Sequence, residues 1–184
     1  LQIASLLIVL AAVFGTVNYL FLRLPSAIGI LIVAFAASLC VLVLDAVFAE
    51  LSAQDVYLEG MILKPNMVIS GKKCPEQASV QEVAERTVKV LKRRVPAAVP
   101  GIAFLSGGQS DVDATAHLDA MNKIGNLPWT LTFSYGRALQ AAALKAWGGK
   151  TEGLDKGRAA HLHRAKMNGL AAQGKWNKGL EKGA

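Results

Sequence analysis

GIAFLSGG, residues 101–108, is a short apolar run that ends in a serine and two glycines. Such a run, bounded by turn-forming residues, is typical of a buried β-strand. The segment that follows it, QSDVDATAHLDAM at residues 109–121, has the pattern of a helix. Residues 101–121 therefore predict a strand followed directly by a helix, which is the repeating unit of parallel α/β folds.

The same unit occurs before and after this segment. VYLEGMILK, residues 56–64, is rich in strand-forming residues and ends before a proline, while LTFSYG, residues 131–136, ends in a glycine. Further helices are predicted at residues 79–94, 137–147 and 154–173. Ser79 and Glu82 form a capping box at the start of the first of these, whose inner face includes Val80, Val83, Ala84 and Leu91. The alternation indicates parallel strands with crossover helices, in a Rossmann-like sheet or in part of a (β/α)₈ barrel. The sequence has no G-x-G-x-x-G motif, which weakens the nucleotide-binding sheet.

Residues 1–44 have a different composition. They contain one charged side chain, Arg23, whereas all 13 Asp and Glu and 19 of the 20 Lys and Arg lie in residues 45–184. The apolar runs 1–22 and 27–44 are each close to the roughly 20 residues that a transmembrane helix needs. We therefore expect residues 1–44 to form a hydrophobic, membrane-spanning helical hairpin in front of the α/β part. A signal peptide and a buried hairpin of a soluble core are the alternatives.

Polar residues and glycines stand where the three predicted strands end. Lys64 ends the first strand, Ser106-Gly107-Gly108 follows the second, and Ser134-Tyr135-Gly136-Arg137 follows the third. In parallel α/β folds the carboxyl ends of the strands meet at one edge, and the chemistry collects there. These residues are therefore the candidate site.

Lys64 is a candidate nucleophile. By the period of two in a strand it shares a face with Leu58, Gly60 and Ile62, at the end of an inward apolar column. A dry position favours the neutral amine, which can attack a carbonyl to form an imine. The alternative is a side chain that reaches solvent from the strand end, as most lysines do.

The two glycine-containing loops are candidate anion sites. Glycine lets backbone N–H groups approach an anion, and Arg137 stands at the start of a predicted helix, where the helix dipole adds to the attraction. Its guanidinium would donate charge-assisted hydrogen bonds to a phosphate oxygen. Two ordinary tight turns with a solvated Arg137 are the alternative.

Four segments of the α/β part are similar to one family, class I fructose-1,6-bisphosphate aldolase. They are LEGMILKPNMV (58–68), FLSGGQS (104–110), PWTLTFSYGRALQ (128–140) and ALKAWGGK (143–150). The resemblance extends from about residue 43 to residue 184, and it implies that the three strands are the sixth to the eighth of a TIM (β/α)₈ barrel.

The resemblance also assigns roles. Lys64 falls on the lysine that forms a Schiff base with the ketone of the substrate. The residues that fall on the phosphate-binding loops are Ser106, Gly107, Ser134, Tyr135, Gly136 and Arg137. Chemistry of this class needs no metal or other cofactor. The resemblance further implies a sugar phosphate as ligand, a homo-oligomer, and a cytoplasmic place for residues 45–184.

The resemblance covers only part of an aldolase. The acid/base carboxylates of the family come from its first five strands, and residues 1–44 hold no acid that replaces them. We therefore expect a truncated aldolase chain that is inactive alone. FLRLPSAIGILIVAFAASL, residues 21–39, resembles the opening helices of bacterial monovalent cation:proton antiporters. A membrane-anchored non-catalytic fragment, or a fusion with an antiporter N-terminus, is accordingly the alternative; without the membrane segment the chain would be purely cytoplasmic.

Two basic features do not point to further ligands. KVLKRR, residues 89–94, lies on a predicted helix and is interpreted as a solvated face rather than as a nucleic-acid site. His161 and His163 are two apart on a helix, where side chains do not face each other. Neither nucleic acid nor a metal ion is therefore predicted as a partner.

Overall fold

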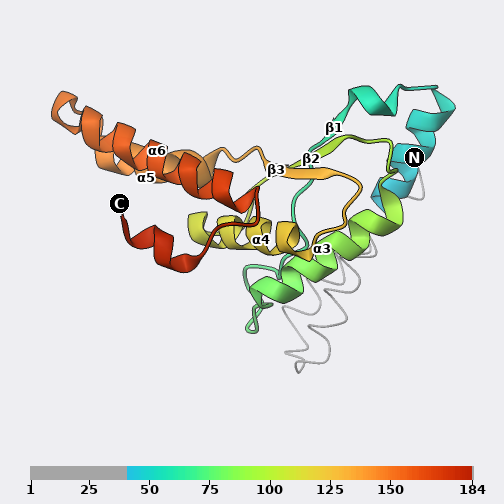
Figure 1. Ribbon diagram of the computed structural model, residues 1–184, viewed down its shortest axis with the longest axis horizontal. Helices are drawn as coiled ribbons and strands as arrows, with labels where there is room; N and C mark the ends of the chain where they lie inside the picture. Colours follow the sequence, from blue (N-terminus) through green and yellow to red (C-terminus); the bar gives the residue numbers. More distant parts are fainter. Residues whose placement is uncertain (1–40, 184) are drawn as a thin grey trace. The chain divides into compact units, whose positions relative to one another are not determined.

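The computed structural model describes residues 41–183. In chain order the elements are the helical residues 41–53, η2 (Leu58–Gly60), β1 (Ile62–Leu63), α3 (Val80–Arg94), β2 (Gly101–Phe104), α4 (Asp111–Ile124), β3 (Thr130–Phe133), α5 (Arg137–Trp147), η3 (Thr151–Gly153), α6 (Leu154–Ala171) and η4 (Lys178–Gly183). The predicted alternation of strand and helix is confirmed (Figure 1).

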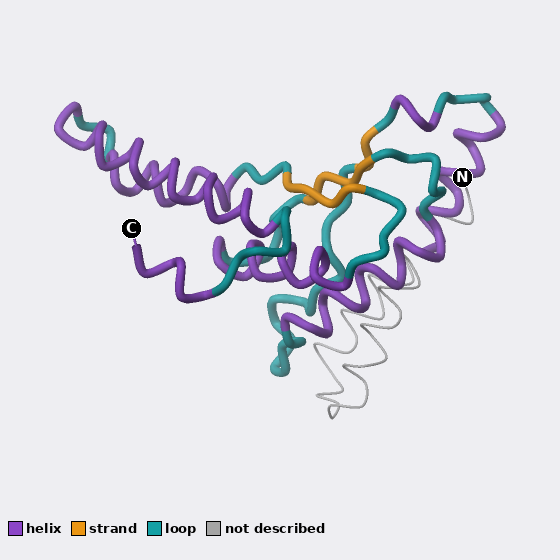
Figure 2. Tube along the Cα trace, viewed as in Figure 1, coloured by secondary structure: helices purple, strands orange, loops and turns teal. Residues whose placement is uncertain are grey.

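The three strands form one parallel sheet in the order β1-β2-β3. Ile62 lies opposite Gly101 in one register, and Phe104 lies opposite Phe133 in the other. Figure 2 shows the short strands side by side, with a helix in each connection from one strand to the next. Since parallel neighbours require crossover connections, this order confirms the predicted class of fold.

The core lies between the sheet and its covering helices, α3 and α4, which run along one side of the strands in Figure 1. Every residue of β2 is buried, as expected for a central parallel strand. The largest fully buried apolar side chains are Ile102, Phe104, Leu118, Met121, Leu131, Val83 and Val99.

Helix α3 begins where the sequence predicts. The Ser79 hydroxyl oxygen accepts a hydrogen bond from the Glu82 N–H at 3.2 Å and thereby satisfies one N–H of the first turn. The Glu82 carboxylate pairs with Arg86 one turn later. Val83, Ala84 and Leu91 are buried, so the predicted inner face is confirmed except for Val80, which is 38% exposed.

The first strand is shorter than predicted. Residues 56–64 were expected to be extended, but Leu58–Gly60 forms a turn of 3₁₀ helix and only Ile62 and Leu63 pair with β2. The N–H groups of Gly60 and Met61 donate to the carbonyls of Tyr57 and Leu58, so local turn bonds replace ladder bonds. The predicted inward column beneath Lys64 is therefore wrong, and Ile62 is 56% exposed.

The C-terminal part packs on α4. Helices α5 and α6 lie side by side (Figure 1), and residues 172–183 are hydrogen-bonded to both α4 and α6. The Trp176 N–H donates to the Asp119 carboxylate at 2.9 Å, and its indole N–H donates to Glu181 at 3.0 Å. The end of the described chain is thus held by buried hydrogen bonds.

Among the helices of residues 41–183, none combines the length and the apolar character that crossing a membrane requires. The two membrane helices predicted for residues 1–44 lie outside the described residues, apart from residues 41–44. Those four belong to the helical stretch 41–53, in which Phe48 is buried.

Phe104 tests whether β2 and its helices form a real core. We expect Phe104→Ala to lower the free energy of unfolding by about 3–5 kcal/mol, because it removes a fully buried ring and leaves a cavity. Leu162→Ala is the matched control, since Leu162 is 68% exposed. Urea unfolding measures both, and equal small losses would contradict this core.

Candidate functional site

The three loops at the carboxyl ends of the strands are hydrogen-bonded to one another. The Leu105 N–H donates to the Pro65 carbonyl at 2.9 Å, and the Ser134 N–H donates to the Phe104 carbonyl at 2.8 Å. The ladder therefore continues one step beyond the strands. It brings Lys64, Ser106 and Ser134 to the same edge of the sheet, as the sequence predicts.

Lys64 is exposed in the described part of the chain. The prediction of a dry position for its amine is thus not met here. The column of residues expected beneath it does not form, because the preceding segment is helical rather than extended. Barrel strands on the far side of β1, which would shield such a position, are not part of residues 41–183.

The loop after β2, residues 106–109, is a tight turn over the sheet edge. Ser106 is buried and its carbonyl accepts the Gln109 N–H at 3.3 Å. Gly108 has a φ of +80° and faces Ile69, so a side chain there would be both strained and crowded. Gly107 is approached by Asn66, whose Nδ2 donates to its carbonyl at 3.2 Å.

Arg137 bridges the second and third loops. Its Nη1 donates to the Asp111 carboxylate at 2.8 Å, and its Nη2 donates to the carbonyls of Ser106 and Gln109. Half of the side chain stays exposed. The predicted anion-binding guanidinium is therefore at the predicted place, where it pairs with a carboxylate.

Helix α5 begins at this edge with Arg137. Its N-cap is Gly136, which has no side chain to cap the first turn. Backbone N–H groups at a helix start favour an anion, and both Ser134 and the glycine lie beside them in the chain. The anion-binding role of this loop stays a prediction.

Tyr135 is placed differently from its neighbours. Its ring is buried, and its hydroxyl donates to the Ala114 carbonyl of α4 at 2.8 Å. Burial raises the pKa of Tyr135, although the charge of Arg164 opposes the shift. The side chain belongs to the core, so only its backbone remains for a ligand.

Asn66 and Gln109 are polar residues of this edge to which the sequence reasoning gave no role. Both stand inside motifs that were singled out, directly after Lys64-Pro65 and after the two glycines. The Gln109 Nε2 group lies 3.5 Å from the Asn66 Oδ1 atom, which links the first loop to the second. Their position after strand ends was the available signal.

A buried histidine lies under the second loop. The His117 Nδ1 atom is 2.7 Å from the Gln109 Oε1 atom, and since that oxygen only accepts, Nδ1 carries the proton. Burial lowers the pKa of His117, against the opposing charge of Asp113. Within residues 41–183, no group of three or more metal-ligating side chains is present.

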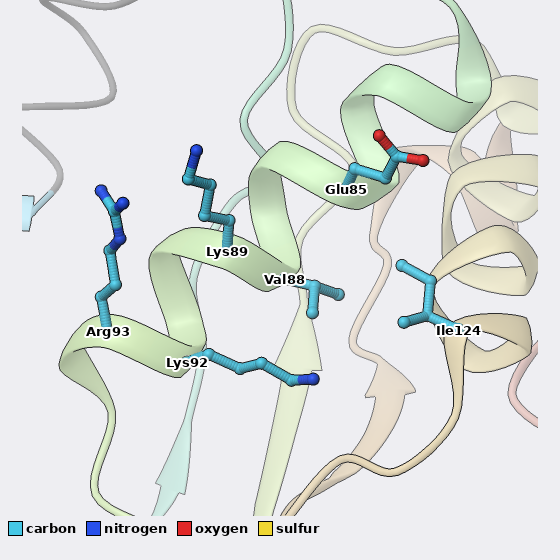
Figure 3. Close-up of a pocket in the computed structure, with 6 residues that line it drawn as sticks. All are labelled: Glu85, Val88, Lys89, Lys92, Arg93 and Ile124. Atoms are coloured by element: carbon cyan, nitrogen blue, oxygen red, sulfur yellow. The ribbon is translucent and has the colours of Figure 1, made fainter.

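An open groove lies elsewhere, on the helical side between α3 and the end of α4 (Figure 3). It is lined by Glu85, Val88, Lys89, Lys92, Arg93 and Ile124. Its cations belong to the run KVLKRR, and they are exposed as the solvated-face interpretation expects. The groove shares no residue with the strand-end loops.

The parallel strands, crossover helices and gathered loops define a parallel α/β fold, of the kind found in part of a (β/α)₈ barrel. The family model for fructose-bisphosphate aldolase class-I matches residues 33–184. The chain therefore belongs to the class I fructose-bisphosphate aldolase family. The comparisons do not support the antiporter resemblance of residues 21–39, and the aldolase match begins inside the second apolar run.

Relatives share the sequence over this part of the chain. A probable fructose-bisphosphate aldolase class 1 of Xanthomonas axonopodis pv. citri is 59% identical over 134 residues, which are 72% of this chain and 40% of that protein. The fructose-bisphosphate aldolase of Echinococcus multilocularis is 52% identical over 143 residues, 77% of this chain and 39% of that protein.

A solved structure shares the fold. It is the fructose-bisphosphate aldolase of Plasmodium falciparum in complex with TRAP and a small-molecule inhibitor, with a TM-score of 0.76 and 47% identity. The alignment covers 79% of this chain and 42% of that one. This chain thus spans about 40% of the length of the curated relatives described.

His117 should make stability depend on pH. The unfolded chain binds a proton near the ordinary histidine pKa of about 6.5, whereas the folded chain binds it only at lower pH. We therefore expect the free energy of unfolding to be greatest above that pH and to fall as the pH drops from 7.5 to 5.5.

The matched variants are His117→Gln and, as control, His161→Gln on the exposed face of α6. Urea midpoints at the two pH values should show a smaller drop for His117→Gln and an unchanged drop for the control. The same drop in all three chains would contradict the assignment.

Proposed function

We propose that the chain carries the Schiff-base and phosphate-binding part of a class I fructose-bisphosphate aldolase. The complete reaction cleaves fructose 1,6-bisphosphate to glyceraldehyde 3-phosphate and dihydroxyacetone phosphate. One observation carries the proposal: in a chain of this family, Lys64, the 106–109 loop and Arg137 converge at one end of a parallel sheet.

Lys64 is the proposed nucleophile. Its neutral amine attacks the ketone carbon, and the resulting carbinolamine takes up one proton from solvent and loses water, which leaves a protonated imine. The imine then accepts the electron pair released when the carbon–carbon bond breaks, so no metal is needed for that step. Lys64 is exposed to water in residues 41–183, and the remaining barrel strands of a complete aldolase would exclude that water.

The phosphate site combines the second and third loops. We assign to it Ser106, Gly107, Ser134, the backbone of Tyr135, Gly136 and Arg137. The start of α5 supplies backbone N–H groups, and Arg137 supplies charge. Arg137 is paired with Asp111, so a phosphate must compete with that carboxylate for the guanidinium.

In the family that this chain resembles, the acid/base groups of the reaction come from the first five strands, to which residues 45–184 do not correspond. We infer that residues 45–184 capture a keto phosphate without efficient cleavage. As an aldolase part they would lie in the cytoplasm and would assemble with further copies. Membrane anchorage through residues 1–44 stays a prediction.

Lys64 can be tested by trapping. Borohydride added with dihydroxyacetone phosphate should label the full chain at Lys64, because reduction fixes the imine, and mass spectrometry of a digest locates the adduct. Lys64→Met should abolish the label, whereas Lys166→Met, at an exposed lysine of α6, should not. If the adduct is spread over many lysines, or if the Lys64→Met variant is still labelled, Lys64 is not the nucleophile of this chain.

Arg137 can be tested in the same assay. We expect Arg137→Ala to raise the half-saturating concentration of dihydroxyacetone phosphate about tenfold, because a charge-assisted hydrogen bond to phosphate is lost. Arg158→Ala is the control, since Arg158 is an exposed arginine of α6 paired with Asp155. An unchanged half-saturating concentration in Arg137→Ala would exclude a phosphate contact.

Turnover should separate capture from cleavage. We expect the chain to cleave fructose 1,6-bisphosphate at least about 100-fold more slowly than a complete aldolase, because acid/base groups contribute that much or more to such steps. A coupled triose-phosphate assay measures both proteins. Comparable rates would mean that the chain holds a complete site after all.

A further inference from the structure

Gln109 contacts residues that follow all three strands. It is buried, at 8% exposure, in the turn after β2. Its side chain meets Asn66 beyond β1, and its carbonyl accepts from Arg137 beyond β3. A buried residue whose side chain bonds to one neighbouring loop and whose carbonyl bonds to the other is placed to set the distances between those loops.

The contact with the first loop has two parts. Asn66 donates from Nδ2 to the Gly107 carbonyl at 3.2 Å, and its Oδ1 atom faces the Gln109 Nε2 group at 3.5 Å. The Gly107 carbonyl is thereby held towards Asn66, so the Gly108 N–H of the same trans peptide points to the opposite side. The side chain of one loop thus fixes the backbone direction of the other.

Pro65, the residue between Asn66 and Lys64, transmits this position to Lys64. Pro65 has a fixed φ, and its carbonyl accepts the Leu105 N–H at 2.9 Å. Lys64 therefore cannot shift along the sheet edge without moving Pro65 and Asn66. A Cβ on Gly107 would come within 3.3 Å of the Asn66 amide, which shows how close the two loops lie.

His117 fixes which way the Gln109 amide points. Its Nδ1–H donates to Oε1, so the NH₂ group of the same amide is turned towards Asn66. Asp113 lies on the same helix, and Arg137 holds the Gln109 backbone from the third loop. The side chain therefore has one hydrogen-bonded orientation.

We propose that Gln109 is a positioning residue that sets the distance between the Lys64 amine and the phosphate loops. It touches neither the ketone nor the phosphate. This inference rests on the proposed function, because a keto phosphate must reach the amine and the anion loops at once. Displacing one end by about 1 Å can reduce such a reaction by about 100-fold.

The test compares two variants with a control in the full chain. Gln109→Met removes both side-chain hydrogen bonds, and Gln109→Glu keeps the acceptor for His117 but loses the donor to Asn66. Gln81→Met is the control, since Gln81 is an exposed glutamine of α3 bonded only one turn away, to Glu85.

Two readouts are measured. Amide hydrogen exchange follows the Leu105 N–H, which joins the first two loops, against the Thr130 N–H, which donates to Pro100 at the other end of the sheet. Borohydride labelling of Lys64 with dihydroxyacetone phosphate follows the reaction, and protection by inorganic phosphate follows anion binding alone.

We expect both Gln109 variants to exchange Leu105 about fivefold faster than the unchanged chain, with Thr130 unchanged. Labelling at saturating ligand should fall about tenfold, while the protecting concentration of phosphate stays within about twofold. If Gln109→Met does not fold, Gln109→Glu alone decides, because it keeps the contact to His117.

The outcomes separate the two proposals. An unlabelled Lys64 in the unchanged chain together with faster Leu105 exchange in the variants would overturn the aldolase chemistry and support the link made by Gln109. Leu105 exchange that is unchanged in both variants would overturn the positioning role, whatever the labelling shows. The positioning role would also be overturned if the labelling of Lys64 in the variants fell only in proportion to their folded fraction, because loss of a merely structural residue has that effect.

Discussion

Parallel pairing of β2 with a strand on each side is the interaction on which the described structure depends. All four residues of β2 are buried, and its backbone is hydrogen-bonded to β1 and to β3. The ladder of hydrogen bonds continues to Leu105 and Ser134, so the first residues of the loops keep the register of the strands. Any residue placed directly after a strand therefore comes to the same edge, and this is how Lys64 and Arg137 lie at one edge of the sheet although 72 residues stand between them in the sequence.

The same pairing explains the exposure of Lys64. Within residues 41–183, β1 and β3 each have β2 as their strand neighbour, so both outer edges lack the ladders that close a barrel. The alignment with the Plasmodium aldolase covers 42% of that chain, and the rest of such a protein has the length to supply the missing strands. The proposed nucleophile would be shielded by the whole ring of a barrel, whereas the proposed binding of an anion by loops 106–109 and 134–137 would depend mainly on β2, β3 and α5.

The sequence predicted those features that depend on neighbours in the chain. The apolar run at 101–104, the capping serine at 79 and the helix that starts at Arg137 are local patterns, and the structure contains each of them. Propensity failed at 58–60, where turn bonds prevail over extended preference. The side-chain links escaped prediction for another reason: Asn66 contacts residues 41 and 43 positions away, and no periodicity carries information over that distance.

Asp111 connects the stability of the helical layer with the site. Arg164 is buried in α6, and it donates to Glu181 near the chain end and to the Asp111 carbonyl at the start of α4. Burial opposes ionisation of Glu181, but the hydrogen bonds from Arg164, Trp176 and His163 lower its pKa, so the Glu181 carboxylate is charged at neutral pH. The Asp111 side chain at the same position holds Arg137. Arg164 thus holds the Asp111 carbonyl, while the Asp111 carboxylate holds Arg137. Because Glu181 in turn holds Arg164, the C-terminal segment stabilises the loop geometry on which the proposed phosphate site depends.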